Sequence, residues 1–195
     1  LRLVAAADVG AISYPARARE GYADDLLANL DQGAIRQRGF RIVVDYGYSA
    51  ASFVLPLVLG PLGVEAVAAH AFTPDLPPGE TETLRGLVGQ TKRLVGAVGA
   101  DLGVVFDRAA ERLYLIDDQA REIPVEQALL LYLRLIGSDG RVGKLAFPVT
   151  VTSQVDRLVE GSSLEVVRTP ASLAELTKAA AQDGVIFAGA VGGGY

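Results

Sequence analysis

The sequence contains the segment Gly99-Ala100-Asp101-Leu102-Gly103-Val104-Val105-Phe106-Asp107-Arg108-Ala109-Ala110-Glu111-Arg112-Leu113. Within it, Leu102–Phe106 is a short apolar, β-branched run bounded by glycine and aspartate. Leu113–Ile116 is a second run of the same kind. The two runs predict buried strands, and the charged residues between them predict a loop over Asp107–Arg112.

Strand and helix patterns alternate before this segment. From Tyr22 onward, apolar residues recur at helical spacing and predict one or two helices that end before Gly39. The other elements predicted here are strands over Arg41–Asp45 and Glu65–Ala69 and helices over Ser52–Leu59 and Thr83–Val98. Such alternation, with short glycine-bearing turns, predicts an α/β fold in which helices cover a sheet.

The second half of the chain repeats this pattern. Helices are predicted over Ile123–Leu135 and Ser153–Val159, and strands over Lys144–Val151 and Leu164–Arg168. Arg41–Glu65 and Lys144–Glu165 both run strand, loop, helix, glycine, strand, which indicates a weak internal repeat. We therefore expect two small α/β units with a boundary near Arg121–Glu126.

The composition limits the classes of partner and compartment. The 195 residues carry a formal net charge of −5 without a basic stripe, so we expect no nucleic-acid partner. The most apolar stretch, Phe53–Ala69, is interrupted by proline, glycine and glutamate and falls short of the roughly 20 apolar residues of a membrane span. We therefore expect no membrane partner. Because cysteine is absent, disulfides and thiolate sites are excluded, and we expect a cytoplasmic location.

The segment from Gly99 resembles Gly-Ala-Asp-Leu-Gly-x-x-Phe-Asp-Gly-Asp-Ala-Asp-Arg of the α-D-phosphohexomutases, the phosphomannomutase and phosphoglucomutase family. The resemblance implies an α/β fold of two small, topologically similar, mixed-sheet domains of the phosphohexomutase type. It assigns residues 1–21 to a tail from a preceding domain, 22–121 to a domain II and 122–195 to an incomplete domain III. Ile42–Ala51 is similar to the start of the family's second domain.

In the family, three loop aspartates hold a magnesium ion. The matching positions here are Asp107, Ala109 and Glu111, followed by the family's arginine as Arg112. Magnesium requires short, near-octahedral oxygen coordination, so the missing ligand at Ala109 predicts a degenerate metal loop and no cofactor. Arg108 stands where the family has glycine, and we interpret it as a charge that replaces the ion. Arg108 and Arg112 are then the expected phosphate contacts.

The end of the chain resembles the family's sugar-binding loop, Gly-Gly-Glu-x-Ser-Gly. The residues that align with it are Gly189, Ala190, Gly192 and Gly193. Alanine and glycine stand in place of the family's glutamate and serine, so two hydrogen-bonding side chains are missing. The loop is therefore expected to be a degenerate sugar loop; its glycines leave open either a backbone anion nest or a flexible loop.

Three other residues are weaker candidates for chemistry. Ser49 lies in a partial nucleophile-elbow pattern, but a hydrolase triad is not expected, because the sequence offers no way to place its one histidine beside that serine. That histidine, His70, ends a strand without an evident cluster of ligands and is interpreted as structural. Ser153 is interpreted as a helix N-cap.

Both family motifs are thus altered. We interpret the chain as a catalytically degenerate phosphohexomutase-like region that serves phosphosugar binding, regulation or assembly. The resemblance also implies a setting in which such a region follows a sugar-phosphate nucleotidyltransferase, as in mannose-1-phosphate guanylyltransferase-like fusions. Because the sequence begins at Leu1 and has no methionine, we expect further domains of the same protein. The sequence does not determine whether the protein forms homo-oligomers.

Two alternatives remain. The first is an active phosphomannomutase or phosphoglucomutase, an intramolecular phosphotransferase that interconverts hexose 1- and 6-phosphates through a phosphoserine on another domain. In that enzyme Asp107 and Glu111 would hold Mg²⁺ and Arg112 would contact the phosphoserine. The second is an α/β small-molecule-binding module unrelated to the mutases.

Overall fold

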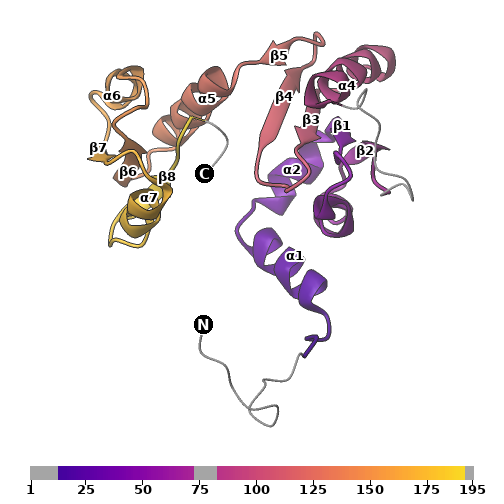
Figure 1. Ribbon diagram of the computed structural model, residues 1–195, viewed down its shortest axis with the longest axis horizontal. Coiled ribbons are helices and arrows are strands. Elements are labelled where there is room, and N and C mark those ends of the chain that lie inside the picture. The colour runs from indigo at the N-terminus through magenta and orange to yellow at the C-terminus, as the bar shows by residue number, and fades with distance from the viewer. Residues whose placement is uncertain (1–12, 73–82, 192–195) are drawn as a thin grey trace, which may run out of the picture.

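The computed structural model describes residues 13–72 and 83–191 of the chain. The elements form two groups, each built on its own sheet, and the chain passes from one group to the other through helix α5 (Val125–Ser138) (Figure 1). Helix α5 also contacts strand β4 of the first group. No helix in these two ranges is both long and apolar enough to cross a bilayer.

The first sheet has the strand order β2-β1-β3-β4-β5. Its strands are β1 (Arg41–Asp45), β2 (Glu65–Ala69), β3 (Leu102–Phe106), β4 (Leu113–Asp117) and β5 (Glu122–Ile123). Strand β1 pairs in parallel with β2 and β3, whereas β3–β4 and β4–β5 are antiparallel hairpins, so the sheet is mixed. The β4–β5 turn is closed by Asp117, which accepts hydrogen bonds from Gln119 N and Arg121 N.

Local signals explain the helices of this group, which are α1 (Ala18–Ala28), α2 (Gln32–Arg38), the 3₁₀ helix η2 (Ala50–Phe53), α3 (Leu55–Leu59) and α4 (Leu84–Val98). Asp31 and Thr83 accept backbone N–H bonds at the starts of α2 and α4. Gly39 and Gly99 end these helices with φ of 65° and 62°.

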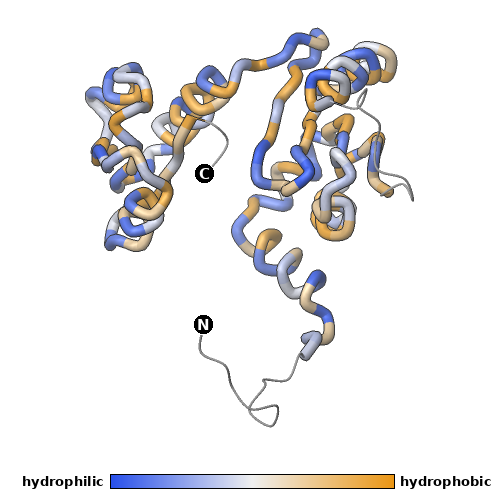
Figure 2. Tube along the Cα trace, in the orientation of Figure 1, coloured by the Kyte–Doolittle hydropathy of each residue, from blue (hydrophilic) through white to orange (hydrophobic). Residues whose placement is uncertain are grey.

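Helix α4 covers the sheet with its apolar face. Leu87, Val88 and Val95 of this helix are buried against Val43, Val105 and Ile116 of the strands. Figure 2 shows these hydrophobic strands joined by a hydrophilic turn between β3 and β4. The turn therefore stands at the edge of a packed sheet.

The second group contains α5, β6 (Gly143–Pro148), α6 (Gln154–Val159), β7 (Leu164–Thr169), α7 (Leu173–Ala180) and β8 (Val185–Ala188). Its sheet has the order β7-β6-β8, and both strand pairs are parallel. The core is formed by side chains of α5, β6 and α6, among them Leu129, Leu133, Leu145, Phe147 and Val155. The expectation of a mixed sheet is wrong for these strands, because helical crossovers join them and such connections produce parallel pairs.

Several predicted boundaries are corrected. The single helix expected over Ser52–Leu59 is divided into η2 and α3, since Pro56 occupies the first turn of a new helix. The strand expected to reach Val151 ends at Pro148, where Val151 N donates to Pro148 O in a turn. The first helix begins at Ala18, within the expected tail. No element was predicted after Arg168, whereas the structure contains α7 and β8 there.

The N-cap expected at Ser153 is also wrong in its chemistry. Ser153 precedes α6, but its side chain makes no capping hydrogen bond. Instead Gln154 N donates to Thr152 Oγ1 at 3.3 Å. Ser153 has a helical backbone, with φ −69° and ψ −5°, rather than the extended geometry typical of a capping residue.

The two groups share one topology. In each, the first parallel strand lies between the second and the third, in the orders β2-β1-β3 and β7-β6-β8. In open sheets of this kind, ligands bind at the carboxyl ends of the strands, where the strand order reverses. In the first sheet this position lies between β1 and β3, so it is bordered by the loops after Asp45 and Phe106.

Candidate functional site

The β3–β4 loop contains the four residues predicted for metal and phosphate binding, which are Asp107, Arg108, Glu111 and Arg112. Asp107 organises this loop. Its Oδ1 accepts hydrogen bonds from Glu111 N at 2.9 Å and from Arg112 N at 3.2 Å. Its backbone N donates to Arg112 O, and its carbonyl accepts from Ala110 N. One oxygen of the Asp107 carboxylate is therefore already occupied by the backbone of its own loop.

The loop does not fit a magnesium ion held by three carboxylates. Ala109 supplies no oxygen from its side chain, and Glu111 is exposed to solvent. Across residues 13–72 and 83–191 there is no group of three or more histidine, cysteine, aspartate or glutamate side chains that could hold a metal. Arg108 adds a cation at the same loop, with its guanidinium carbon 6.0 Å from the ring centre of Tyr48.

A buried carboxylate lies beside this loop, at the end of β1. Asp45 is completely buried, and its Oδ1 accepts from Gly47 N at 2.9 Å. Its Oδ2 accepts from Thr91 Oγ1 at 3.3 Å and contacts His70 Nδ1 at 2.9 Å. Burial of an ionised carboxylate is unfavourable unless several donors surround it, and here three do. His70, interpreted as structural from sequence, is thus part of a polar cluster at the sheet edge.

Two aromatic residues at this edge have left-handed backbone conformations. Tyr48 has φ 60° and His70 has φ 47°. Their backbones are joined by a hydrogen bond from Tyr48 N to His70 O, and their rings meet edge to face at 5.0 Å. Positive φ is unfavourable for bulky residues and is found preferentially at binding sites and catalytic centres.

Ser49 lies at the same edge, and its side chain makes no hydrogen bond to His70. Ser49 is 3% exposed, and its Oγ has no hydrogen-bond partner among the described residues. A nucleophilic serine requires a hydrogen bond to its base. The histidine–aspartate pair at this edge is not hydrogen-bonded to Ser49.

Sequence reasoning missed Asp45 because the partners are far apart in the chain. Asp45 and His70 are separated by 25 positions. They meet because Asp45 pairs with Ala69 in the parallel β1–β2 register, and His70 is the residue that follows Ala69. The only local sign of this pair in the sequence is that Asp45 and His70 each directly follow an apolar run.

The predicted sugar loop belongs to the second group of elements. Gly189 N donates to Ala146 O at 3.1 Å, which continues the β6–β8 pairing. Ala190 packs against a small cluster formed by Ala146, Leu176 and Ala179. The other two predicted residues, Gly192 and Gly193, lie outside the described residues.

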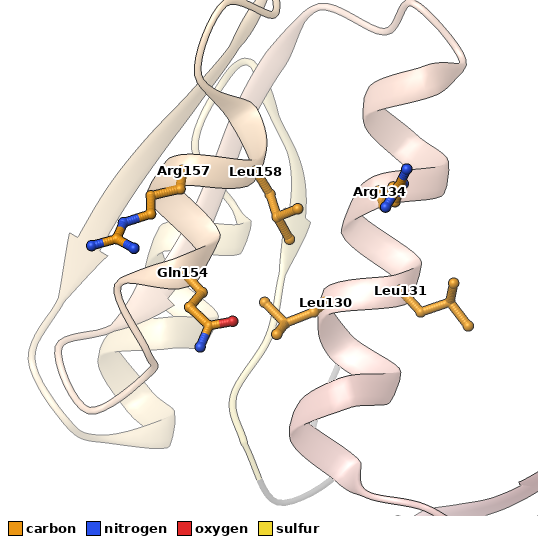
Figure 3. Close-up of a pocket in the computed structure, with 6 residues that line it drawn as sticks. All are labelled: Leu130, Leu131, Arg134, Gln154, Arg157 and Leu158. Carbon is orange, nitrogen blue, oxygen red and sulfur yellow. The ribbon is translucent and has the colours of Figure 1, made fainter.

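Two largely apolar hollows border helix α5. One, of about 390 Å³, lies between α5 and α6, where Leu130, Gln154 and Leu158 point into the gap and Arg157 points away from it (Figure 3). The other, of about 320 Å³, is lined by Leu113, Leu115, Ala128, Tyr132 and Phe187. Neither contains converging polar groups of the kind that fix a small ligand.

Comparison with known proteins agrees with this architecture. A putative phosphomannomutase from Thermus thermophilus superposes with a TM-score of 0.76 and 20% identity, covering 90% of this chain and 41% of that one. A phosphoglucomutase/phosphomannomutase family protein from Burkholderia thailandensis gives a TM-score of 0.72 and 19% identity, covering 90% and 38% of the two chains. These likenesses concern the fold.

Two curated relatives match most of the chain. A probable phosphoglucosamine mutase of Methanopyrus kandleri is 30% identical over 165 residues, 82% of this chain, and a phosphoglucosamine mutase of Parafrankia sp. is 31% identical over 167 residues, 85% of it. The chain spans 36% of the length of each relative. The family model described as phosphoglucomutase/phosphomannomutase, alpha/beta/alpha domain II, matches residues 20–120, more than half of the chain. The chain therefore belongs to the phosphoglucomutase/phosphomannomutase family.

Proposed function

We propose that this chain is a phosphosugar-binding region of a phosphohexomutase-family protein that does not carry out metal-dependent phosphoryl transfer. The β3–β4 loop is the observation on which this proposal rests. Ala109 supplies no ligand, and Asp107 Oδ1 accepts two backbone N–H bonds. Magnesium would therefore meet an Asp107 carboxylate with one oxygen already hydrogen-bonded, an exposed Glu111 and the cation of Arg108.

Phosphosugars are the expected ligand class for two reasons. The relatives named above are called phosphoglucosamine mutases, which makes glucosamine phosphates the first candidates. The loop also offers Arg108 and Arg112 at the carboxyl edge of the sheet, and guanidinium groups bind phosphate through charge-assisted hydrogen bonds. Such binding would serve regulation or assembly of a larger protein in the cytoplasm. The nucleotidyltransferase fusion stays a prediction.

An active mutase is the second candidate. Family membership favours it, together with the retained Asp107 and Arg112 at the family's loop positions. In this case the loop would have to bind magnesium with Asp107 and Glu111 alone among its carboxylates. The phosphoserine would come from another domain.

Calorimetry with the 195-residue chain separates the two candidates. We expect glucosamine 6-phosphate to bind saturably, both with and without magnesium, and magnesium alone to show no saturable binding in the millimolar range. Glucosamine and inorganic phosphate serve as controls for the two halves of the ligand. Magnesium-dependent interconversion of glucosamine 1- and 6-phosphate by the complete natural polypeptide would overturn the proposal in favour of the active mutase. Absence of phosphosugar binding by this chain would refute the proposed function.

A further inference from the structure

Three polar or charged side chains follow adjacent strands at the carboxyl edge of the first sheet. His70 comes directly after β2, Tyr48 lies in the loop after β1, and Arg108 lies in the loop after β3. The strand order β2-β1-β3 places Tyr48 between the other two. The rings of Tyr48 and His70 are 5.0 Å apart, and Arg108 lies 6.0 Å from the Tyr48 ring. The three therefore form a continuous row, called here the edge row.

Asp45 determines which nitrogen of His70 is available. Asp45 Oδ2, which contacts His70 Nδ1, also accepts a hydrogen bond from the hydroxyl of Thr91, so this oxygen acts as an acceptor. Nδ1 is then the donor and carries the proton, which leaves Nε2 as the acceptor of the neutral ring. The His70 side chain is 19% exposed, whereas Asp45 is not exposed at all. The His70 ring is therefore partly accessible to solvent, whereas the carboxylate that contacts it is not.

The backbone holds this arrangement at an energetic cost. Left-handed conformations of non-glycine residues are unfavourable and persist where the surroundings impose them. Tyr48 and His70 both have such conformations, and a backbone hydrogen bond joins them. The imidazole is therefore fixed in place before any ligand binds.

From this geometry we propose that His70 and Arg108 form a two-point binding site for a phosphosugar, with Tyr48 as the positioning residue between them. Arg108 binds the phosphate group, and His70 Nε2 accepts a hydrogen bond from a sugar hydroxyl. The two residues follow strands that flank β1, roughly 10 Å apart at two strand spacings, a distance that a hexose phosphate spans. The inference rests on the proposed function and adds His70 and Tyr48, which lie outside the loop and carry no metal role.

Nitrogen NMR tests the site directly, because His70 is the only histidine in the chain. In protein labelled with ¹⁵N-histidine, we expect the neutral ring to carry its proton on Nδ1 and to leave Nε2 unprotonated. Glucosamine 6-phosphate should shift the Nε2 signal saturably, with the same midpoint as calorimetry. Unphosphorylated glucosamine should do so only weakly. A neutral ring that carries its proton on Nε2 in the free protein, or an Nε2 signal that the bound phosphosugar leaves unchanged, overturns the site.

Matched variants provide a second readout. His70→Asn suits the left-handed backbone and retains an N–H donor for Asp45, but it lacks Nε2. We expect it to weaken glucosamine 6-phosphate binding about three- to tenfold. Arg108→Gln should weaken it more, whereas the control Arg134→Gln, an exposed arginine on α5, should not. Circular dichroism confirms that each variant is folded.

The outcomes separate this inference from the proposed function. If the parent binds the phosphosugar and His70→Asn binds it equally well, the two-point site is wrong and the proposed function stands. If the parent binds no phosphosugar, the proposed function and the two-point site both fail.

Discussion

Gly47 lies against the backbone carbonyl of Phe106. A Cβ atom at Gly47 would come within 2.3 Å of Phe106 O, a distance that real side chains do not reach. The loop after β1 therefore packs directly on the base of the β3–β4 loop, and Gly47 has a φ of 53°. The absence of a side chain at this position fixes the spacing between the two loops of the candidate site.

Gly47→Ala should consequently destabilise the protein by about 2–4 kcal/mol, because the methyl group forces the two loops apart and the backbone is left-handed. Urea unfolding followed by circular dichroism measures the effect. Gly39→Ala is the matched control, since Gly39 also has a positive φ, 65°, but no atoms lie within 4 Å of its Cβ position. The control should lose only about 1 kcal/mol. Equal losses of stability in the two variants would show that the close contact with Phe106 O does not contribute to the effect of Gly47→Ala.

Strands bounded by strong local signals were predicted well from the sequence. The predicted ranges of β1, β2 and β3 coincide with the observed ones. Each is a short apolar run with a glycine, aspartate or histidine at its end, so neighbouring residues alone define it. Prediction failed where a proline changes the local geometry, as at Pro56 and Pro148, because periodicity alone does not detect such breaks.

The candidate site was predictable only in part. The position of the Asp107–Arg112 loop follows from two adjacent strands, which are local in sequence. The contact between Asp45 and His70 depends on the parallel register of β1 and β2 and on two positive-φ residues. Register is set by the packing of whole strands, and so a single sequence does not reveal it.

Tyr46 gives the protein a specific sensitivity to alkaline pH. Its side chain is 2% exposed, and burial raises the pKa of its phenol above the ordinary value of 10.0. A raised pKa means that the folded state holds the proton more tightly than the unfolded state. The associated stability is present in full below the ordinary pKa of 10.0 and is lost as the pH rises through the folded pKa.

Tyr46→Phe removes this ionisation and should move the alkaline unfolding midpoint to higher pH, while stability at neutral pH changes by about 1 kcal/mol or less. Circular dichroism across a pH series from roughly 8 to 12, which brackets the ordinary tyrosine pKa, measures the midpoint. The control is Tyr14→Phe, because Tyr14 is 88% exposed. If both variants shift the alkaline unfolding midpoint equally, the burial of Tyr46 is not the cause of the shift.

Arg168 holds the loop between β6 and α6. Its guanidinium donates to Val151 O at 2.8 Å and pairs with Asp156 on α6. We expect Arg168→Leu to destabilise the second group by about 1.5–3 kcal/mol, because the loop carbonyl loses a charged donor. Amide hydrogen exchange should show the largest loss of protection in α6.

The matched control for Arg168 is Arg141→Leu. Arg141 pairs with Asp139, but both side chains are more than half exposed. Exposed ion pairs contribute about 0–1 kcal/mol, so this variant should unfold almost like the parent. A larger effect of Arg141→Leu than of Arg168→Leu would contradict the assigned role of Arg168.

The final prediction concerns restoration of the metal loop. The triple variant Arg108→Gly, Ala109→Asp, Glu111→Asp places three aspartates in the frame that the β3–β4 hairpin already presents. Asp107 Oδ1 is engaged by the backbone of the loop, so Oδ2 is the oxygen through which Asp107 would bind a metal. Since the variant also removes the cation of Arg108, it should bind magnesium saturably in the millimolar range or below, where the parent does not.

Isothermal calorimetry of the parent and the variant measures this difference, with the single change Arg108→Gly as the control for charge alone. That control should bind no magnesium, because two carboxylates remain in the loop and one of them, Glu111, is exposed and longer than aspartate. If the control binds as tightly as the triple variant, the repulsion of Arg108 and not the missing ligand prevents metal binding. If the triple variant binds no magnesium, the alignment of this loop with the metal loop of the family is wrong.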